Sequence, residues 1–153
     1  MDSKVMEINK LLVEVYDDIG KIEIESLKQG EFKDLSISEI HTIEAIGMYT
    51  EKTMSEVAAK LEITTGTLTT AVDKLIKKGY VERNRNESDR RIVNIKLTKR
   101  GKLAYRIHEK FHSDMVKRVM DGFTEQEEVV LISGLNKLNA YLKETSEKIK
   151  KKL

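Results

Sequence analysis

The sequence predicts a mainly α-helical protein with one small β-hairpin, and three observations support this fold class. Apolar residues recur every three or four positions along most of the chain, as they do in amphipathic helices. Residues 80–97 instead alternate apolar and polar side chains, which is typical of strands. The 153 residues include no proline, so no proline interrupts long helices. The length allows one domain, or one domain with a dimerisation extension.

The helices expected are, in chain order, residues 8–27, 37–46, 54–61, 65–78, 99–121 and a last one from 125 onward. Glycines follow several of these segments and are typical helix ends. Three segments are preceded by a capping box, in which a Ser or Thr and a Glu three residues later bond each other's backbone N–H groups. These pairs are Ser36 with Glu39, Thr53 with Glu56, and Thr124 with Glu127.

Composition and charge exclude several classes of functional site and of protein. The absence of cysteine excludes disulfides, thiolate metal sites and cysteine redox switching. The chain shows no signal core and no apolar stretch long enough for a membrane span, so we expect a cytoplasmic protein without membrane contact. Residues 64–118 carry 15 Lys and Arg against 6 Asp and Glu, whereas residues 1–63 carry 7 against 14. A basic third of the chain suits contact with phosphates, although a solvated charged face explains it equally well.

Residues 53–97 have the order of a winged helix-turn-helix: two short helices, a sharp turn and a charged hairpin. The second helix carries threonines on its polar face, although threonine is a mediocre helix former. Hydroxyls can bond base edges or phosphates, and threonine methyls can contact thymine. A weakly helical surface with capping threonines is the alternative. We expect DNA contacts from Thr53, Ser55, Thr64, Thr65, Thr67, Thr69, Thr70 and Lys74.

The hairpin tip, or wing, is expected to present four arginines, Arg83, Arg85, Arg90 and Arg91. Arginine is favoured in narrow minor grooves and on phosphates. Asp89 is expected to brace one arginine and leave its neighbour to contact DNA. A solvated turn is the alternative.

The last helix has a coiled-coil-like apolar seam, in which leucines are spaced by four, three and four residues. The seam comprises Leu131, Leu135, Leu138 and Leu142. The expected organisation is therefore an N-terminal dimerisation helix over 1–34, a winged helix-turn-helix DNA-binding domain over 35–98, and C-terminal dimerisation helices over 99–153.

The hairpin also resembles the wing signature of the MarR family of bacterial regulators, and the resemblance extends over nearly the whole chain. The matching pattern is D-x-R-x-x-x-I-x-L-T-x-x-G, from Asp89 to Gly101. The resemblance implies an intertwined helical dimer of winged helix-turn-helix subunits. It also implies that the helix from Thr65 lies in the major groove, that Arg90 enters the minor groove, and that Asp89 pairs with Arg91.

The segments SISEIHTIEAIG and LTKRGKLAYRIHEKFHSDMV resemble one branch of this family, which represses fatty-acid biosynthesis genes in Firmicutes. That resemblance implies double-stranded DNA with an imperfect palindrome as the target and long-chain acyl-acyl-carrier protein as the corepressor. A MarR-type regulator released by a small aromatic or phenolic effector, and a protein-interaction module without DNA binding, are the alternatives.

A lipid or small ligand would lie between the first two helices and the fifth. Apolar side chains and methionines there suit a flexible acyl chain, although each is equally compatible with core packing. The candidate pocket residues are Ile22, His41, Ile43, Met48, Leu103, Ile107, Phe111 and Met115.

Residues 108–112 spell H-E-x-x-H, the zinc-peptidase pattern, with both histidines on one helical face. The flanks are basic, no cleft is inferred, and His41 is the one further histidine in the sequence. We therefore expect no enzyme activity, no metal and no cofactor. A polar patch near the ligand pocket or dimer junction is favoured over adventitious metal binding and over a metal-dependent hydrolase.

Overall fold

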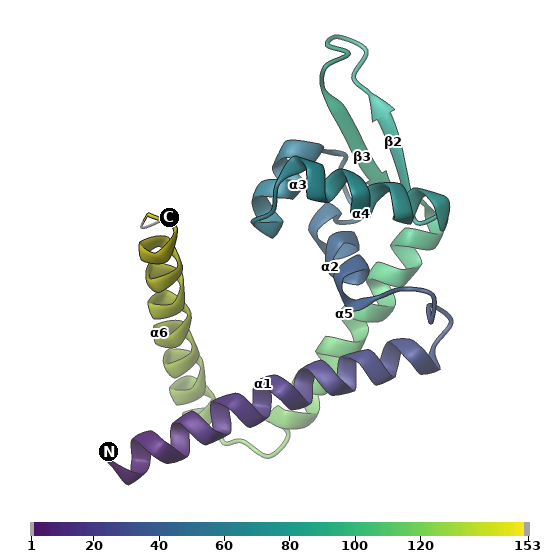
Figure 1. Ribbon diagram of the computed structural model, residues 1–153. Helices are drawn as coiled ribbons and strands as arrows, with labels where there is room; N and C mark the ends of the chain where they lie inside the picture. Colours follow the sequence, from purple (N-terminus) through teal and green to yellow (C-terminus); the bar gives the residue numbers. More distant parts are fainter. Residues whose placement is uncertain (1, 152–153) are drawn as a thin grey trace. The chain divides into compact units, whose positions relative to one another are not determined.

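The computed structural model describes residues 2–151, and its contacts divide the chain into two compact units, one ending at Glu109 and the other beginning at Lys110. This division lies inside the helix expected over residues 99–121, whereas the domain boundary expected from the sequence lies before that helix, between residues 98 and 99. The elements are α1 (Ser3–Gln29), α2 (Ile37–Ile46), β1 (Lys52–Thr53), α3 (Met54–Leu61), α4 (Thr65–Lys77), β2 (Val81–Arg85), β3 (Val93–Leu97), α5 (Lys99–Met120) and α6 (Glu125–Lys150) (Figure 1).

The helix starts follow the predicted capping chemistry, and all three capping boxes are present. At α2, the Ser36 hydroxyl accepts from the Glu39 backbone N–H at 3.2 Å, and the Glu39 carboxylate accepts from the Ser36 N–H at 2.8 Å. Gly30 and Gly47 cap the ends of α1 and α2. Local sequence therefore determines where most helices of this chain begin and end.

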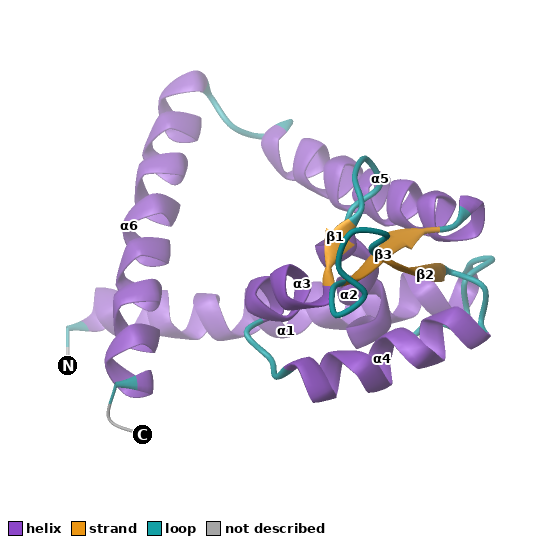
Figure 2. Ribbon diagram, turned by 90° about the horizontal axis from the view of Figure 1, so that it is seen from above, coloured by secondary structure: helices purple, strands orange, loops and turns teal. Residues whose placement is uncertain are grey.

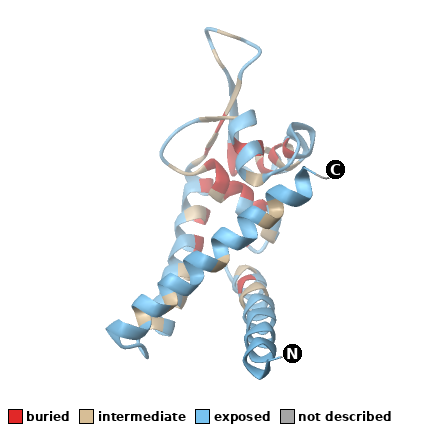
Figure 3. Ribbon diagram, turned by 90° about the vertical axis from the view of Figure 1, so that its left-hand side faces the viewer, coloured by how far each residue is buried: buried red, intermediate tan, exposed pale blue. Residues whose placement is uncertain are grey.

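The hydrophobic core of the first unit lies where α2, α3 and α4 pack together and against the sheet (Figure 3). Each helix contributes one apolar stripe, as the periodicity predicts. The fully buried side chains include Ile40, Ile43, Ile46, Val57, Leu68, Val72, Leu75, Tyr80 and Ile95. This core fixes the orientation of α4 relative to the hairpin that follows it.

The hairpin is part of a three-stranded antiparallel sheet with strand order β1-β3-β2 (Figure 2). The β2–β3 pairing runs from Val81 opposite Leu97 to Arg85 opposite Val93. The short strand β1 pairs Lys52 with Ile95, a strand that the sequence did not predict. Gly79 turns the chain from α4 into β2 with φ of +81°, a conformation that favours glycine.

Helices α1 and α6 expose long apolar faces. Within the described residues, α1 buries only Glu23 and α6 buries no residue. Leu135 and Leu142 of the predicted seam are 53% and 55% exposed, and Leu131 and Leu138 are half-buried. Between residues 2 and 151, no helix combines the length and apolar character that crossing a membrane requires.

Candidate nucleic-acid interface

Helix α4 has one buried and one exposed face, as predicted. Leu68, Val72 and Leu75 are fully buried against the core. The opposite face carries the exposed side chains Thr65, Thr67, Thr69, Thr70 and Lys74. The face that the sequence assigns to DNA is therefore accessible along the helix.

The threonine hydroxyls of this face already have partners within the helix. Thr64 caps α4 by accepting from the Thr67 backbone N–H at 3.1 Å, and the two hydroxyls lie 2.9 Å apart. Thr69 donates to the Thr65 carbonyl at 2.8 Å, and Thr70 donates to the Gly66 carbonyl at 3.4 Å. The bonds of Thr69 and Thr70 give their hydroxyls partners on the helix itself, although bonds of this kind to the carbonyl four residues earlier slightly destabilise a helix.

Thr53 and Ser55 lie at the start of α3. Thr53 caps α3, where its hydroxyl accepts from the Glu56 backbone N–H at 3.1 Å. The hydrogen bonds that Glu56 accepts from the Thr53 backbone and hydroxyl lower the pKa of this carboxyl. Ser55 is exposed in the first turn. Both residues therefore lie at the capped N-terminus of α3. Thr53 is half-buried there.

The wing differs in part from the prediction. Arg83 and Arg85 lie in strand β2 and not on the loop, because the strand continues to Arg85. Arg83 donates to Asp73 of α4 at 2.7 Å, so this pair links the wing to α4. Arg90 and Arg91 do lie in the loop between the strands.

The loop at the tip is held by its own polar groups. The Asn86 side chain accepts from the Ser88 backbone N–H at 2.8 Å. Asp89 accepts from the backbone N–H of Arg91 at 3.0 Å and from its Nε at 3.2 Å, which confirms the predicted brace. Arg90 has no hydrogen-bond or ion-pair partner among residues 2–151. The tip thus presents one braced arginine beside one whose guanidinium is available.

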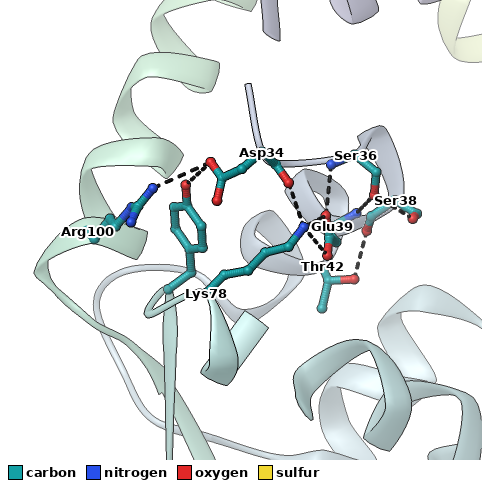
Figure 4. Close-up of polar contacts among 8 residues, drawn as sticks. Asp34, Ser36, Ser38, Glu39, Thr42, Lys78 and Arg100 are labelled. Atoms are coloured by element: carbon teal, nitrogen blue, oxygen red, sulfur yellow. Dashed lines mark hydrogen bonds and ion pairs between the residues drawn. The ribbon is translucent and has the colours of Figure 1, made fainter. Parts of the chain in front are cut away.

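A polar network fixes the C-terminal end of α4 against α2 and α5 (Figure 4). Lys78 donates to both Glu39 carboxylate oxygens at 2.8 Å and to the Asp34 carbonyl at 2.5 Å. Asp34 also accepts from the Tyr80 hydroxyl at 2.7 Å and from Arg100 at 3.4 Å. Sequence reasoning missed this network, because its members are separated by up to 66 positions along the chain.

Two pKa shifts follow from this packing. Burial raises the pKa of Tyr80 to about 12, and the bond that Tyr80 donates to Asp34 acts in the same direction. Burial also raises the pKa of Glu39, but the hydrogen bonds from Lys78 and Ser36 outweigh it, so the net pKa lies below 4.5. Glu39 is therefore ionised at neutral pH and accepts hydrogen bonds from Lys78 with both carboxylate oxygens.

The Lys78→Ala substitution tests this network. We expect a loss of about 1–2 kcal/mol in the free energy of unfolding at pH 7, between the values of surface and buried ion pairs. A lowered folded-state pKa stabilises the protein above the unfolded-state value of 4.5, and this stabilisation disappears as the pH falls through the folded-state pKa of Glu39. Urea unfolding at several pH values measures the difference, which should shrink on acidification. A difference independent of pH would contradict the assigned ion pair.

The predicted ligand-pocket residues differ in their burial. Ile43 is fully buried in the helix-turn-helix core, and Met48 packs against that core. Ile22, Leu103 and Ile107 are exposed. Phe111 and Met115 are partly exposed and belong to the second unit. A groove of about 600 Å³ does lie along α1 and the start of α2, lined by Tyr16, Ile19, Gly20, Glu23, Ile24, Ile37 and His41 among others, and His41 is its one predicted member.

Comparisons with known proteins agree with this architecture. A family model described as the MarR family matches residues 35–93. The crystal structure of Streptococcus pneumoniae FabT in complex with DNA is similar over 92% of this chain and 98% of that chain, with 41% identity and a TM-score of 0.88.

Two curated Bacillus subtilis relatives are more distant. The uncharacterised HTH-type transcriptional regulator YpoP is 29% identical over 86% of this chain and 88% of its own length. The uncharacterised HTH-type transcriptional regulator YhjH is 25% identical over 72% of this chain. The chain spans 63% of the length of YhjH.

Proposed function

This chain belongs to the MarR family, and we propose that it is a sequence-specific DNA-binding transcriptional regulator that acts as a homodimeric repressor. The observation that carries the proposal is the exposed threonine face of α4 beside a wing whose Arg90 is available for contact. Both lie within the basic part of the sequence, residues 64–118. The similarity to FabT, whose structure contains DNA, supports the same assignment.

In the proposed complex each subunit places α4 in a major groove and its wing in the flanking minor groove. A two-fold dimer then recognises an imperfect palindrome with half-sites roughly one helical turn, ~34 Å, apart. The exposed apolar faces of α1 and α6 supply the surface for the second subunit. Because phosphate contacts by Lys and Arg release counterions, binding should weaken steeply as salt rises.

We further propose that the targets are fatty-acid biosynthesis genes and that long-chain acyl-acyl-carrier protein is the corepressor. The sequence resemblance to this branch of the family and the 41% identity with FabT support this step. A corepressor acts by binding the DNA-competent conformation more tightly than the other conformations. A release of DNA by a small aromatic or phenolic effector is the competing regulation.

Fluorescence anisotropy with a palindromic site from a fatty-acid gene promoter tests the function, with and without long-chain acyl-acyl-carrier protein. Tighter binding with the acylated partner is the expected result. Unchanged binding would favour an aromatic or phenolic effector and overturn the corepressor. Failure to select any sequence from a random DNA pool would overturn DNA binding and favour a protein-interaction module.

The same titration tests the wing with the Arg90→Ala variant. We expect at least about tenfold weaker operator binding, since a hydrogen bond to a charged group contributes about 1.5–3 kcal/mol. The dimer should remain intact in light scattering. Lys137→Ala, which removes an exposed cation from α6, is the matched control and should bind like the unmodified chain. Equal affinity of Arg90→Ala and the unmodified chain would exclude the wing assignment.

A further inference from the structure

Three potential metal ligands from three helices of the first unit converge: Glu23 from α1, His41 from α2 and His108 from α5. The His108 Nε2 lies 3.0 Å from Glu23 Oε1, and the His41 Nε2 lies 3.2 Å from the same oxygen. One ligand atom of each residue lies within 4.8 Å of the other two. Because the residues are far apart in sequence, only the fold brings them together.

A further carboxylate lies beside His108, since Glu44 Oε1 is 3.3 Å from His108 Nε2, but Glu44 is not part of this cluster of three. The cluster therefore offers two imidazole nitrogens and one carboxylate oxygen, and water would complete a tetrahedral shell. Four ligand atoms around a tetrahedral Zn²⁺, each about 2.0–2.2 Å from the ion, are separated by about 3.4 Å. The two nitrogen–oxygen separations within the cluster, 3.0 and 3.2 Å, are near that value, so small side-chain movements would admit an ion.

Burial and access also suit an ion. The side chains of His108 and Glu23 are 3% and 7% exposed, whereas that of His41 is 46% exposed. Glu23 and His41 also line the groove along α1, through which water can reach them. Burying a carboxylate or an imidazole raises the free energy of the folded state unless the group is paired or coordinates a metal. A cluster that is closed on one side and open on the other can take up a hydrated cation.

We propose that Glu23, His41 and His108 bind one Zn²⁺ per subunit, with water in the fourth position. Nitrogen and oxygen donors without a thiolate suit zinc and other first-row divalent ions. A zinc ion at this position would overturn the sequence-based expectation of no metal. Its ligand set would also differ from the H-E-x-x-H pattern, because Glu23 and His41 would accompany His108 in place of His112.

Such a site would join α1 to the helix-turn-helix core. His41 and Glu44 are on α2, whose Ile40 and Ile43 are buried in that core. An ion shared by α1, α2 and α5 would therefore restrain the position of α1 relative to the DNA-contacting part of the same unit. Metal binding itself is measured without DNA, so its outcome is independent of the proposed function.

The test is isothermal titration of the full chain, first stripped with EDTA and then dialysed, with ZnCl₂. We expect one saturable site per subunit, a rise in the melting temperature, and release of protons, because ligands must be deprotonated. His41→Ala should weaken zinc binding by at least about tenfold, as even outer-shell losses have effects of this size. His41 is largely exposed, so this variant should keep its far-UV circular dichroism.

The control is Glu109→Gln, which removes an exposed carboxylate next to His108 and should leave zinc affinity unchanged. His108→Gln provides a second ligand variant. The proposal would be overturned if the unmodified chain bound no zinc. It would also be overturned if His41→Ala and His108→Gln bound zinc as tightly as the unmodified chain. Either result would leave the cluster as a network of ion pairs. Loss of zinc binding in His112→Ala with unchanged binding in His41→Ala would instead favour the H-E-x-x-H pattern, whose two histidines are the zinc ligands, and overturn this ligand set.

Discussion

Gly101→Ala is expected to lower the free energy of unfolding by about 3 kcal/mol, at the upper end of the usual cost of overpacking. A Cβ at this position would overlap the Tyr80 carbonyl oxygen and lie 3.2 Å from the Leu97 Cβ. The Tyr80 carbonyl cannot easily move, because it accepts from the Thr98 backbone N–H at 3.0 Å and the Tyr80 side chain is fully buried. Helix α5 would have to move away from the sheet.

Urea unfolding at neutral pH measures this loss, and Gly66→Ala is the matched control. Gly66 is an exposed helical glycine whose added Cβ meets only the Thr64 hydroxyl at 3.9 Å. Alanine there should leave stability unchanged or raise it by up to about 1 kcal/mol through helix propensity. An unfolding midpoint of Gly101→Ala equal to that of the unmodified chain would show that α5 does not approach Tyr80 this closely.

Leu138→Glu is expected to raise the dimer dissociation constant by about 10²–10⁴-fold. Burying a leucine contributes about 1.5–3 kcal/mol, a symmetric interface loses two leucines, and each 1.4 kcal/mol is tenfold in affinity. A 26-residue helix with no buried residue needs a partner surface, because most helix stability in proteins comes from packing. The leucine seam is the part of α6 proposed to provide it.

Light scattering over a range of protein concentrations measures the change. Asn136→Glu adds the same charge two residues earlier, on the opposite side of α6, and should leave the dimer intact. If Leu138→Glu is as dimeric as Asn136→Glu, the seam is not the interface. A dimer lost in both variants would indicate that a wider part of α6 is buried between subunits.

Features set by neighbouring residues were predictable from the sequence. The three capping boxes confirm this, because a Ser or Thr and a Glu three residues later interact only through local backbone geometry. The pairing of Asp89 with Arg91 was likewise available from the family resemblance and is confirmed. The buried stripe of α4 follows from helical periodicity alone.

Features that depend on distant residues were not predictable. Strand β1 is two residues long and exists only through pairing with β3, about 40 positions away, so no local pattern marks it. Ile43 could equally have lined a ligand pocket or the core, since both require an apolar side chain, and the structure places it in the core. The cluster of Glu23, His41 and His108 joins three helices, whereas the H-E-x-x-H spacing indicates partners along one helix only.

The internal hydrogen bonds of the threonines on α4 have a consequence for the chemistry of base recognition. Thr69 and Thr70 use their hydroxyl protons on carbonyls of their own helix. Their oxygens therefore face outward as acceptors, complementary to the amino groups of adenine and cytosine in the major groove, and their methyls suit thymine. A guanine, which offers only acceptors there, would require a hydroxyl to give up its helix bond. In the proposed complex, the polarity of these two hydroxyls biases the half-site against guanine opposite this part of α4.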